Sequence, residues 1–428
     1  MDKNMLEAEN AAGGISAPIL AENETFSLRR GEKIAAFLLY IGAYIYMDGL
    51  KSWKLAVFVV LFIALTELLN RGKPRPWESW IWLGCMTVIT LSLLLERAAV
   101  WEDFSLLFLH IFAVWWALSR SGRLLEGESG HLLPFDALNG FVVFPFRNFF
   151  LRLKTLWYTL TGPLRGKERS KPETVIWTIG ALAAAGLLFW LVLGLLVDAD
   201  QGFAELISRW LLELDIRIDG EIWLKFLFSL PVGAYLFGLL AGSARADEEK
   251  LRLRGQRINS ALSRLGKVPN LVWTLLTGLF CLLYLLFFVV QARYLFGAFT
   301  RSLPEGFIVS EYARQGFFEL CKVMAVNFVL LWLVTRLSAK PSRENRAEML
   351  LCLILLAESM LFAAIAFSKL MLYISCFGFT PRRLQSSWLV CVLFFGCLCA
   401  GYSLLSGKKS FRAWMIFGAV SLTLLHLY

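Results

Sequence analysis

Apolar residues along this chain gather in long runs that short polar segments separate. A helix crosses the roughly 30 Å core of a bilayer with about 20 apolar residues, and eleven runs approach that length. Backbone groups in hydrocarbon must bond internally, and no alternating ten-residue pattern suggests a barrel, so the runs are predicted to be helices. The fold class is therefore all-α, a polytopic membrane helix bundle of about 11 transmembrane helices. The runs cover approximately residues 33–48, 52–69, 77–95, 102–119, 174–197, 222–242, 270–298, 314–336, 348–373, 384–405 and 411–427.

The polar segments between these runs predict the orientation of the bundle. Lys and Arg concentrate in short cytoplasmic loops of membrane proteins. With the N-terminus in the cytoplasm, the cytoplasmic segments hold 30 of the 43 Lys and Arg residues, whereas the outer loop 198–221 is acidic. The prediction is therefore N-in and C-out. The cytoplasmic segments are 1–33, 70–76, 120–173, 243–269, 336–347 and 406–412.

The chain divides into a polar start and a membrane domain. Residues 1–32 are expected to be a disordered cytoplasmic tail, because they lack the basic segment and apolar core of a cleavable signal peptide. Residues 33–428 are expected to form one multi-helix membrane domain.

Composition agrees with a membrane protein. Hydrophobic residues make up 58% of the chain and charged residues 18%, below the roughly 25% charge of soluble domains. The net charge of +10 raises nucleic-acid binding as an alternative. Its cations lie in short loops between apolar runs, so orientation in a bilayer explains them better. We expect no nucleic-acid partner, the lipid bilayer as the main partner, and a cell membrane as the location.

Chemistry typical of soluble enzymes has little support. The chain has no phosphate-binding loop, no HExxH, no GxSxG and no dinucleotide-binding fingerprint. The three histidines are far apart and the eight cysteines include no CxxC pair. We therefore expect no catalytic residues, no cofactor and no metal.

Residues 141–160 mix cations with Phe, Leu and Trp, as an interfacial helix does. Arg147, Arg152 and Lys154 are candidates for binding anionic lipid headgroups at the cytoplasmic face. The alternative is a loop that only follows the positive-inside rule.

Charges inside the predicted helices are the main candidates for function. A charge at the centre of a membrane helix costs about 2.5–3.5 kcal/mol, so it usually faces a partner, a cavity or the bundle interior. One polar stripe on the eighth helix has four such charges, and Glu358 lies near the middle of the ninth helix. The stripe consists of Glu311, Arg314, Gln315, Phe318, Glu319 and Lys322.

Depth in the membrane predicts how these groups meet. If the eighth and ninth helices are antiparallel neighbours, Glu319 reaches the level of Lys369, and Asn327 reaches that of Glu358. The alternatives are structural: buried pairs can fix helix register, and Lys322 and Lys369 can extend toward the interface.

Three phrases resemble a known family. They are Gln291–Gly297 (QARYLFG), Ser310–Leu320 (SEYARQGFFEL) and Leu372–Arg383 (LYISCFGFTPRR). The region 291–383 is similar to a bacterial polytopic membrane family of unknown function, numbered four-one-seven-three, and to its relative four-one-five-three. Phe377 stands where that pattern has tyrosine. The resemblance implies a multi-helix bacterial membrane protein and no assigned activity.

The last phrase also predicts a helix boundary. Gly378 is typical of a helix end, and Pro381 of the first turn of the next helix. Arg382 and Arg383 then stand on the outer side, where they meet Glu311 or Glu305, or are solvated.

Two function classes remain. The first is transport or conduction of a small polar solute or ion through the polar cluster of the seventh to ninth helices. The second is an envelope sensory, regulatory or scaffold protein without transport. An enzyme acting on lipid ranks third, because no paired His/Asp or Ser/His arrangement is evident.

Overall fold

The structure is a computed structural model, and it is helical throughout the part of the chain that it describes. The single β feature there is an isolated bridge between Val268 and Ser338. The all-α prediction is therefore confirmed. The described residues are 29–48, 53–95, 100, 103–161, 172–199, 202–203, 220–264, 267–292 and 317–427. The predicted tail 1–32 lies almost entirely outside them.

The helices follow the predicted apolar runs closely. The first half contains α2 (Arg30–Asp48), α3 (Trp53–Leu69), α4 (Glu78–Leu94), α5 (Ser105–Ser121), α6 (Leu133–Leu138), the π-helix η1 (Asn139–Val143), α7 (Phe144–Arg147), α8 (Leu151–Thr161), α9 (Pro172–Ala199) and α11 (Gly220–Arg245). The second half contains α12 (Glu248–Arg264), α13 (Asn270–Val290), α16 (Phe317–Leu337), α17 (Arg346–Phe377), α18 (Pro381–Ser406) and α19 (Phe411–Leu425).

Each of the eleven predicted runs corresponds to one of these helices. Within the described ranges, five helices are long and apolar enough to cross a membrane: α11, α13, α16, α17 and α18. The chain therefore has the construction of an integral membrane protein. Shorter apolar helices, including α4, α5 and α19, accompany the five.

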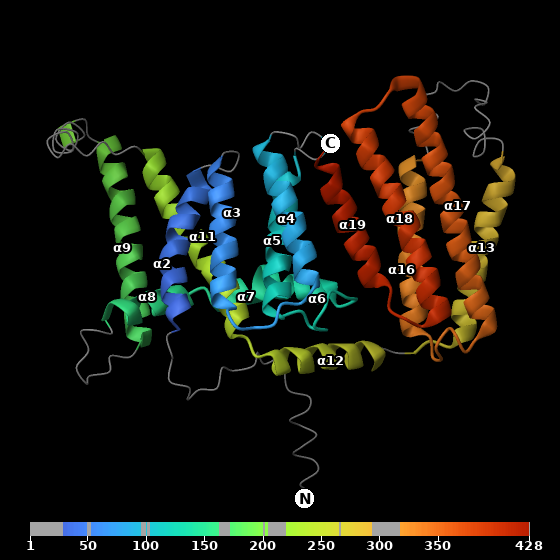
Figure 1. Ribbon diagram of the computed structural model, residues 1–428, viewed down its shortest axis with the longest axis horizontal. Coiled ribbons are helices and arrows are strands. Elements are labelled where there is room, and N and C mark those ends of the chain that lie inside the picture. Colours follow the sequence, from blue (N-terminus) through green and yellow to red (C-terminus); the bar gives the residue numbers. More distant parts are fainter. Residues whose placement is uncertain are drawn as a thin grey trace, which may run out of the picture.

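The long helices stand side by side, and α12 lies across one end of them (Figure 1). The short helices α6, α7 and α8 lie at that same end, which we call the loop side. Helix α2 begins there, and α19 ends on the opposite side (Figure 1). The loop side thus gathers the described parts of segments 120–173 and 243–269, the two longest predicted cytoplasmic loops.

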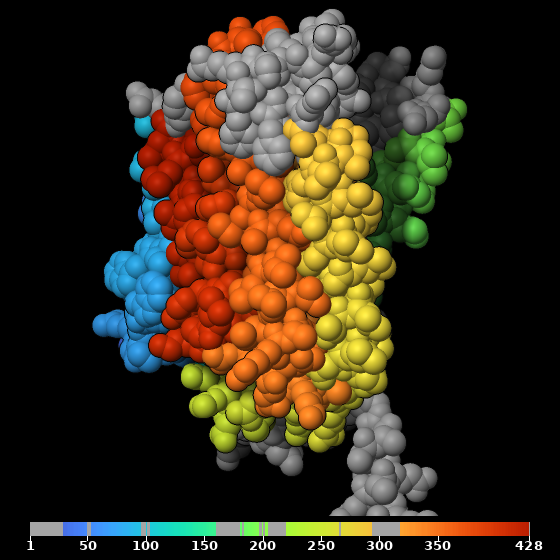
Figure 2. All heavy atoms as spheres, turned by 90° about the vertical axis from the view of Figure 1, so that its right-hand side faces the viewer, coloured from blue at the N-terminus to red at the C-terminus, as the bar shows by residue number. Residues whose placement is uncertain are grey.

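Buried apolar residues form two cores. The first core joins α2 to α5 with α11, and Leu422 of α19 belongs to it. The second core joins α13, α16, α17 and α18. Figure 2 shows this second group from its outer face, with α13 beside the helices that follow it in sequence. The predicted polar cluster lies in the second core.

The boundary between α17 and α18 follows its local sequence. Gly378 follows α17 with a φ of 77°, a conformation that favours glycine. Thr380 precedes α18 and Pro381 is its first residue, although the Thr380 side chain makes no capping hydrogen bond. The predicted helix end and start are confirmed.

Candidate functional site

Helix α17 carries one buried stripe along nearly its whole length. Successive members are four and then three residues apart, which keeps them on one face of a helix. Every member is at most 1% exposed. The stripe consists of Glu348, Cys352, Leu355, Ser359, Phe362, Ala366 and Lys369. Polar residues therefore stand at both of its ends and at its middle.

A buried carboxylate occupies the loop-side end of the stripe. Glu348 accepts hydrogen bonds from Asn270 Nδ2 at 2.6 Å and from Ser338 Oγ at 2.9 Å. Its backbone N–H meets the Asn345 side chain at 3.4 Å, as in an N-terminal cap. Three segments of the second core thus converge on this carboxylate.

The middle of the stripe joins three helices through side chains. Tyr284 of α13 donates from its hydroxyl to Asn327 Oδ1 at 2.7 Å. Asn327 of α16 donates from Nδ2 to Ser359 Oγ at 2.8 Å. The Ser359 hydroxyl in turn donates to the Leu355 carbonyl of its own helix. Helices α16 and α17 are antiparallel neighbours, and Asn327 bonds the residue next to Glu358 rather than Glu358 itself.

Glu358 faces α13 beside this chain of hydrogen bonds. Its carboxyl interacts with the Cys281 thiol and acts electrostatically on Tyr284. One carboxyl oxygen, Oε2, is buried and has no hydrogen-bond partner among the described residues.

Other buried polar atoms of α13 also lack partners. The hydroxyls of Thr274 and Thr277 and the indole N–H of Trp273 have none among the described residues. By contrast, the Thr66 hydroxyl bonds the carbonyl four residues back in its helix. Buried polar groups are normally satisfied by protein or by water. The loop-side half of α13 therefore carries several buried polar atoms that bond no other described residue.

Aromatic rings fill this interface on the side of Glu358 that faces away from the loop side. The Phe362 ring lies 4.7 Å from that of Phe288 and 6.1 Å from that of Phe287, between centroids. Tyr284 packs edge-on against Phe362 at 5.2 Å. These rings separate the middle polar group from the charges nearer the opposite side.

Lys369 and Glu319 lie beyond the aromatic rings. Lys369 is fully buried within the protein. The exposed Glu319 acts on it electrostatically without a direct ion pair. Lys322 is exposed. Glu311 and Arg314 lie outside the described residues.

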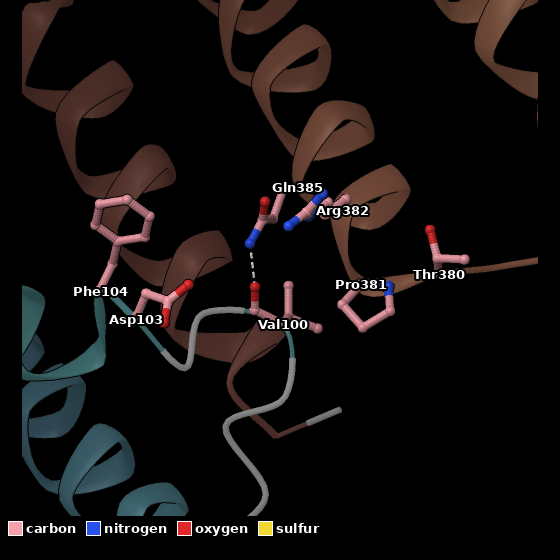
Figure 3. A pocket seen from close by; sticks show the side chains of 7 residues that line it. All are labelled: Val100, Asp103, Phe104, Thr380, Pro381, Arg382 and Gln385. Carbon is pink, nitrogen blue, oxygen red and sulfur yellow. Dashed lines mark hydrogen bonds between the residues drawn. The ribbon is translucent and has the colours of Figure 1, made fainter.

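The two arginines after α17 have different surroundings. Arg383 donates to the carbonyl oxygens of Phe377 and Gly378 and lies 4.2 Å from the Tyr373 ring, so it caps the end of α17. Arg382 is exposed and lines a small pocket with Asp103 and Gln385 (Figure 3). The predicted contacts with Glu305 or Glu311 lie outside the described residues.

The three candidate headgroup cations also differ in their surroundings. Arg152 is 5% exposed, and its Nε donates to the Ala36 carbonyl at 3.1 Å. The space for its guanidinium comes from Gly233, where an added Cβ would stand 2.8 Å from an Arg152 nitrogen. Arg152 therefore packs between α2 and α11, and lipid binding at this residue stays a prediction. Arg147 is exposed and Lys154 half-buried at the loop side.

Sequence reasoning missed several buried carboxylates at the loop side. Glu32, Glu78, Asp136 and Glu348 are each at most 1% exposed. These carboxylates lie at helix ends, where the sequence pattern predicts solvent-exposed loop residues. A local signal existed only for Glu348, because Asn345 three residues earlier makes a capping pattern.

The described residues offer no group of three His, Cys, Asp or Glu side chains that could hold a metal ion. All eight cysteines are free thiols. The polar groups of the second core described above are hydroxyl, amide, carboxyl and ammonium groups.

The fold and this site define an integral membrane protein with polar groups inside its helix bundle. Residues 33–428 match the model of the family described as Domain of unknown function (DUF4153), and the chain belongs to that family. The number four-one-seven-three is thereby corrected to that of its relative. No curated protein and no solved structure matches the chain.

Proposed function

We propose that this protein conducts protons or another small polar ion along the α13–α17 interface, with Glu358 as the group that binds the ion. The observation that carries the proposal is the set of unpaired buried atoms at Glu358, Thr274 and Thr277. A hydrated line of this kind would connect the loop side to an intramembrane carboxylate, and such carboxylates commonly mark ion paths.

The topology belongs to the same proposal. All eleven apolar helices cross the membrane, with the N-terminus and the loop side in the cytoplasm. The gathering of cation-rich segments on the loop side supports this orientation. We place residues 33–428 as one membrane domain in a bacterial cytoplasmic membrane, with 1–32 as a cytoplasmic tail. Anionic lipids contact Arg147 and Lys154.

The aromatic closure shapes the mechanism. A path that ends at Phe362 conducts only when this ring and Phe288 move apart. Glu358 takes up the ion from the loop side, and displacement of the rings exposes it toward Lys369 and Glu319. If the rings never separate, the site senses an ion without passing it, and the protein is regulatory or a scaffold.

Glu358→Gln tests the proposal because glutamine retains the shape and hydrogen bonding of glutamate but cannot titrate. Full-length protein is reconstituted in vesicles with an internal pH dye, and proton flux is driven by an imposed potential. Parallel vesicles report sodium and potassium. We expect Glu358→Gln to lower the flux by about a hundredfold, a usual factor for losing a positioned proton carrier.

The matched control is Glu344→Gln, which removes an exposed carboxylate from the loop before α17 and should leave the flux unchanged. Equal flux in Glu358→Gln and wild type at equal protein level would contradict conduction and favour the regulatory alternative.

A further inference from the structure

Five cations meet at the loop side, away from the α13–α17 interface. The ends of α3, α5 and α11 bring them together with the residue that precedes α2. Arg75 and Arg120 both pair with Glu67, and Arg123 pairs with the exposed Glu248 at 3.4 Å. The cations are Arg29, Lys73, Arg75, Arg120 and Arg123.

Lys73 stands at the centre of this cluster. Its ammonium donates to the Ala244 carbonyl at 2.8 Å. Burial, and after it the charges of Arg123, Arg29 and Arg120, lower the pKa of Lys73 to about 8, while Glu248 acts in the opposite direction. Cations therefore outnumber the carboxylates that face them.

Two of the arginines keep buried donors without partners. Arg120 is 5% exposed, and one of its terminal nitrogens, Nη1, has no hydrogen-bond partner among the described residues. The same holds for Arg75 Nε. A buried guanidinium N–H is costly to leave unmet, so the cluster has donors available for an acceptor.

The C-terminal end of α11 offsets only part of this charge. Arg123 Nε donates to the Ser243 carbonyl at 2.9 Å, next to the carbonyl that Lys73 contacts. A helix C-terminus is equivalent to about half a negative charge. Glu32 is engaged by Arg245, and Asp247 by Lys250. Asp247 also acts electrostatically on Arg123. Among the described residues, the five cations therefore face three carboxylates, those of Glu67, Glu248 and Asp247.

We propose that this cluster binds a phosphate group, with Lys73, Arg120 and Arg29 as its donors. Phosphate oxygens accept several charge-assisted hydrogen bonds at once, and arginine forks suit them. Lys73 is half-buried and Arg29 exposed, so the phosphate approaches from the aqueous loop side. The same chemistry fits the headgroup of an anionic phospholipid and free inorganic phosphate.

Native mass spectrometry of the full chain in detergent tests the site with phosphatidylglycerol, and with diacylglycerol as the lipid without phosphate. We expect Lys73→Gln to weaken phosphatidylglycerol binding by about fivefold, which corresponds to about 1 kcal/mol per cation near a membrane surface. Lys73→Arg should bind as wild type does. The matched control Arg71→Gln removes an exposed cation from the same loop and should change nothing.

Equal losses in Lys73→Gln and Arg71→Gln would overturn the site, because a diffuse surface charge would then explain the binding. Arg29→Gln, at an exposed position, provides a second variant that leaves the fold intact and should also weaken binding. A thermal-shift series with inorganic phosphate identifies the source. Stabilisation by phosphate that Lys73→Gln abolishes assigns a free anion, and binding of phosphatidylglycerol alone assigns the lipid. Binding of neither refutes the proposal.

Discussion

At the scale of single residues, burial rather than charge separates the informative positions. The sequence marked Glu358 because it lies deep within an apolar run. It gave no reason to choose Glu78, which accepts from Trp82 Nε1 at 2.8 Å and pairs with Arg412 at 3.1 Å. Glu78 follows a proline-rich loop, and only packing of the loop after α5 over it removes it from water.

Asp136 gives a prediction about pH. Burial raises the pKa of its carboxyl from 3.8 to about 7, with smaller contributions from Glu126 and Glu78, while the Leu125 N–H opposes the shift. The folded state thus retains a proton that the unfolded state releases. Stability from this group is greatest below the unfolded pKa and falls as pH rises through the folded value.

Asp136→Asn should therefore gain stability relative to wild type as pH rises. The asparagine keeps an acceptor for the Leu125 N–H, which bonds Oδ1 at 2.8 Å, and carries no charge. Melting temperatures in detergent between about pH 5 and pH 8 measure the difference, which should widen up to about pH 7 and then stay constant. Asp103→Asn, at an exposed carboxyl, should show no such trend. A difference in melting temperature between Asp136→Asn and wild type that does not change with pH would contradict the raised pKa of Asp136.

At the scale of elements, the sequence pattern predicts where each helix lies in the chain. It does not predict which helices pack against one another. The stripe on α17 has the spacing of a helix buried along one face. Nothing in that spacing says that Ser359 meets Asn327 or that Phe362 meets Phe288. The Ser359–Asn327 pair depends on α16 lying beside α17. The Phe362–Phe288 pair depends on α13 lying beside α17, although α16 separates the two helices in the chain.

Close approach of elements depends on glycine at one point in particular. A Cβ at Gly238 of α11 would strike the Pro145 carbonyl oxygen and stand 3.1 Å from its carbon. Because these are backbone atoms, the clash can be relieved only if α7 moves away from α11. Gly238→Ala should therefore lower the free energy of unfolding by about 1–3 kcal/mol.

Thermal unfolding in detergent measures this loss. Gly84→Ala is the matched control, since a Cβ there meets nothing within 4 Å on a helix of the same core, and alanine favours helix. Equal melting temperatures for Gly238→Ala and wild type would show that α7 packs less closely against α11.

At the scale of the whole molecule, two cores are held together through the end of the chain. Leu422 of α19 packs into the first core, while α18 packs into the second. Before and within the first turn of α19, Lys409 pairs with Glu126 at 2.8 Å, and Arg412 pairs with Glu78 and Glu128. The loop-side ends of the two halves are therefore tied by charge as well as by apolar contact.

Topology can be tested directly with reporters. The eleven crossings that we propose would place the C-terminus outside and α12 in the cytoplasm. A fluorescent reporter that folds only in the cytoplasm should stay dark when fused after Tyr428 and be bright when inserted at the exposed Glu249 of α12. An alkaline phosphatase fusion at the same two sites should give the opposite result. Fluorescence from the C-terminal fusion would place the C-terminus in the cytoplasm and lower the number of crossings by one.

The sequence by itself determined the class of protein and the position of its helices. Burial of apolar runs in lipid depends on local composition and length, which one chain shows directly. It also identified Glu358, Lys369 and Asn327, because a polar residue inside an apolar run stands out without any knowledge of neighbours.

Only the tertiary structure decided what those residues meet. Contacts between α13, α16 and α17 arise from packing over long sequence separations, so the bonds of Tyr284 and the unpaired Glu358 oxygen have no local signature. The same reason explains Arg152, whose sequence surroundings suggest a membrane surface. Its burial between α2 and α11 requires Gly233 and the Ala36 carbonyl to come together from distant parts of the chain.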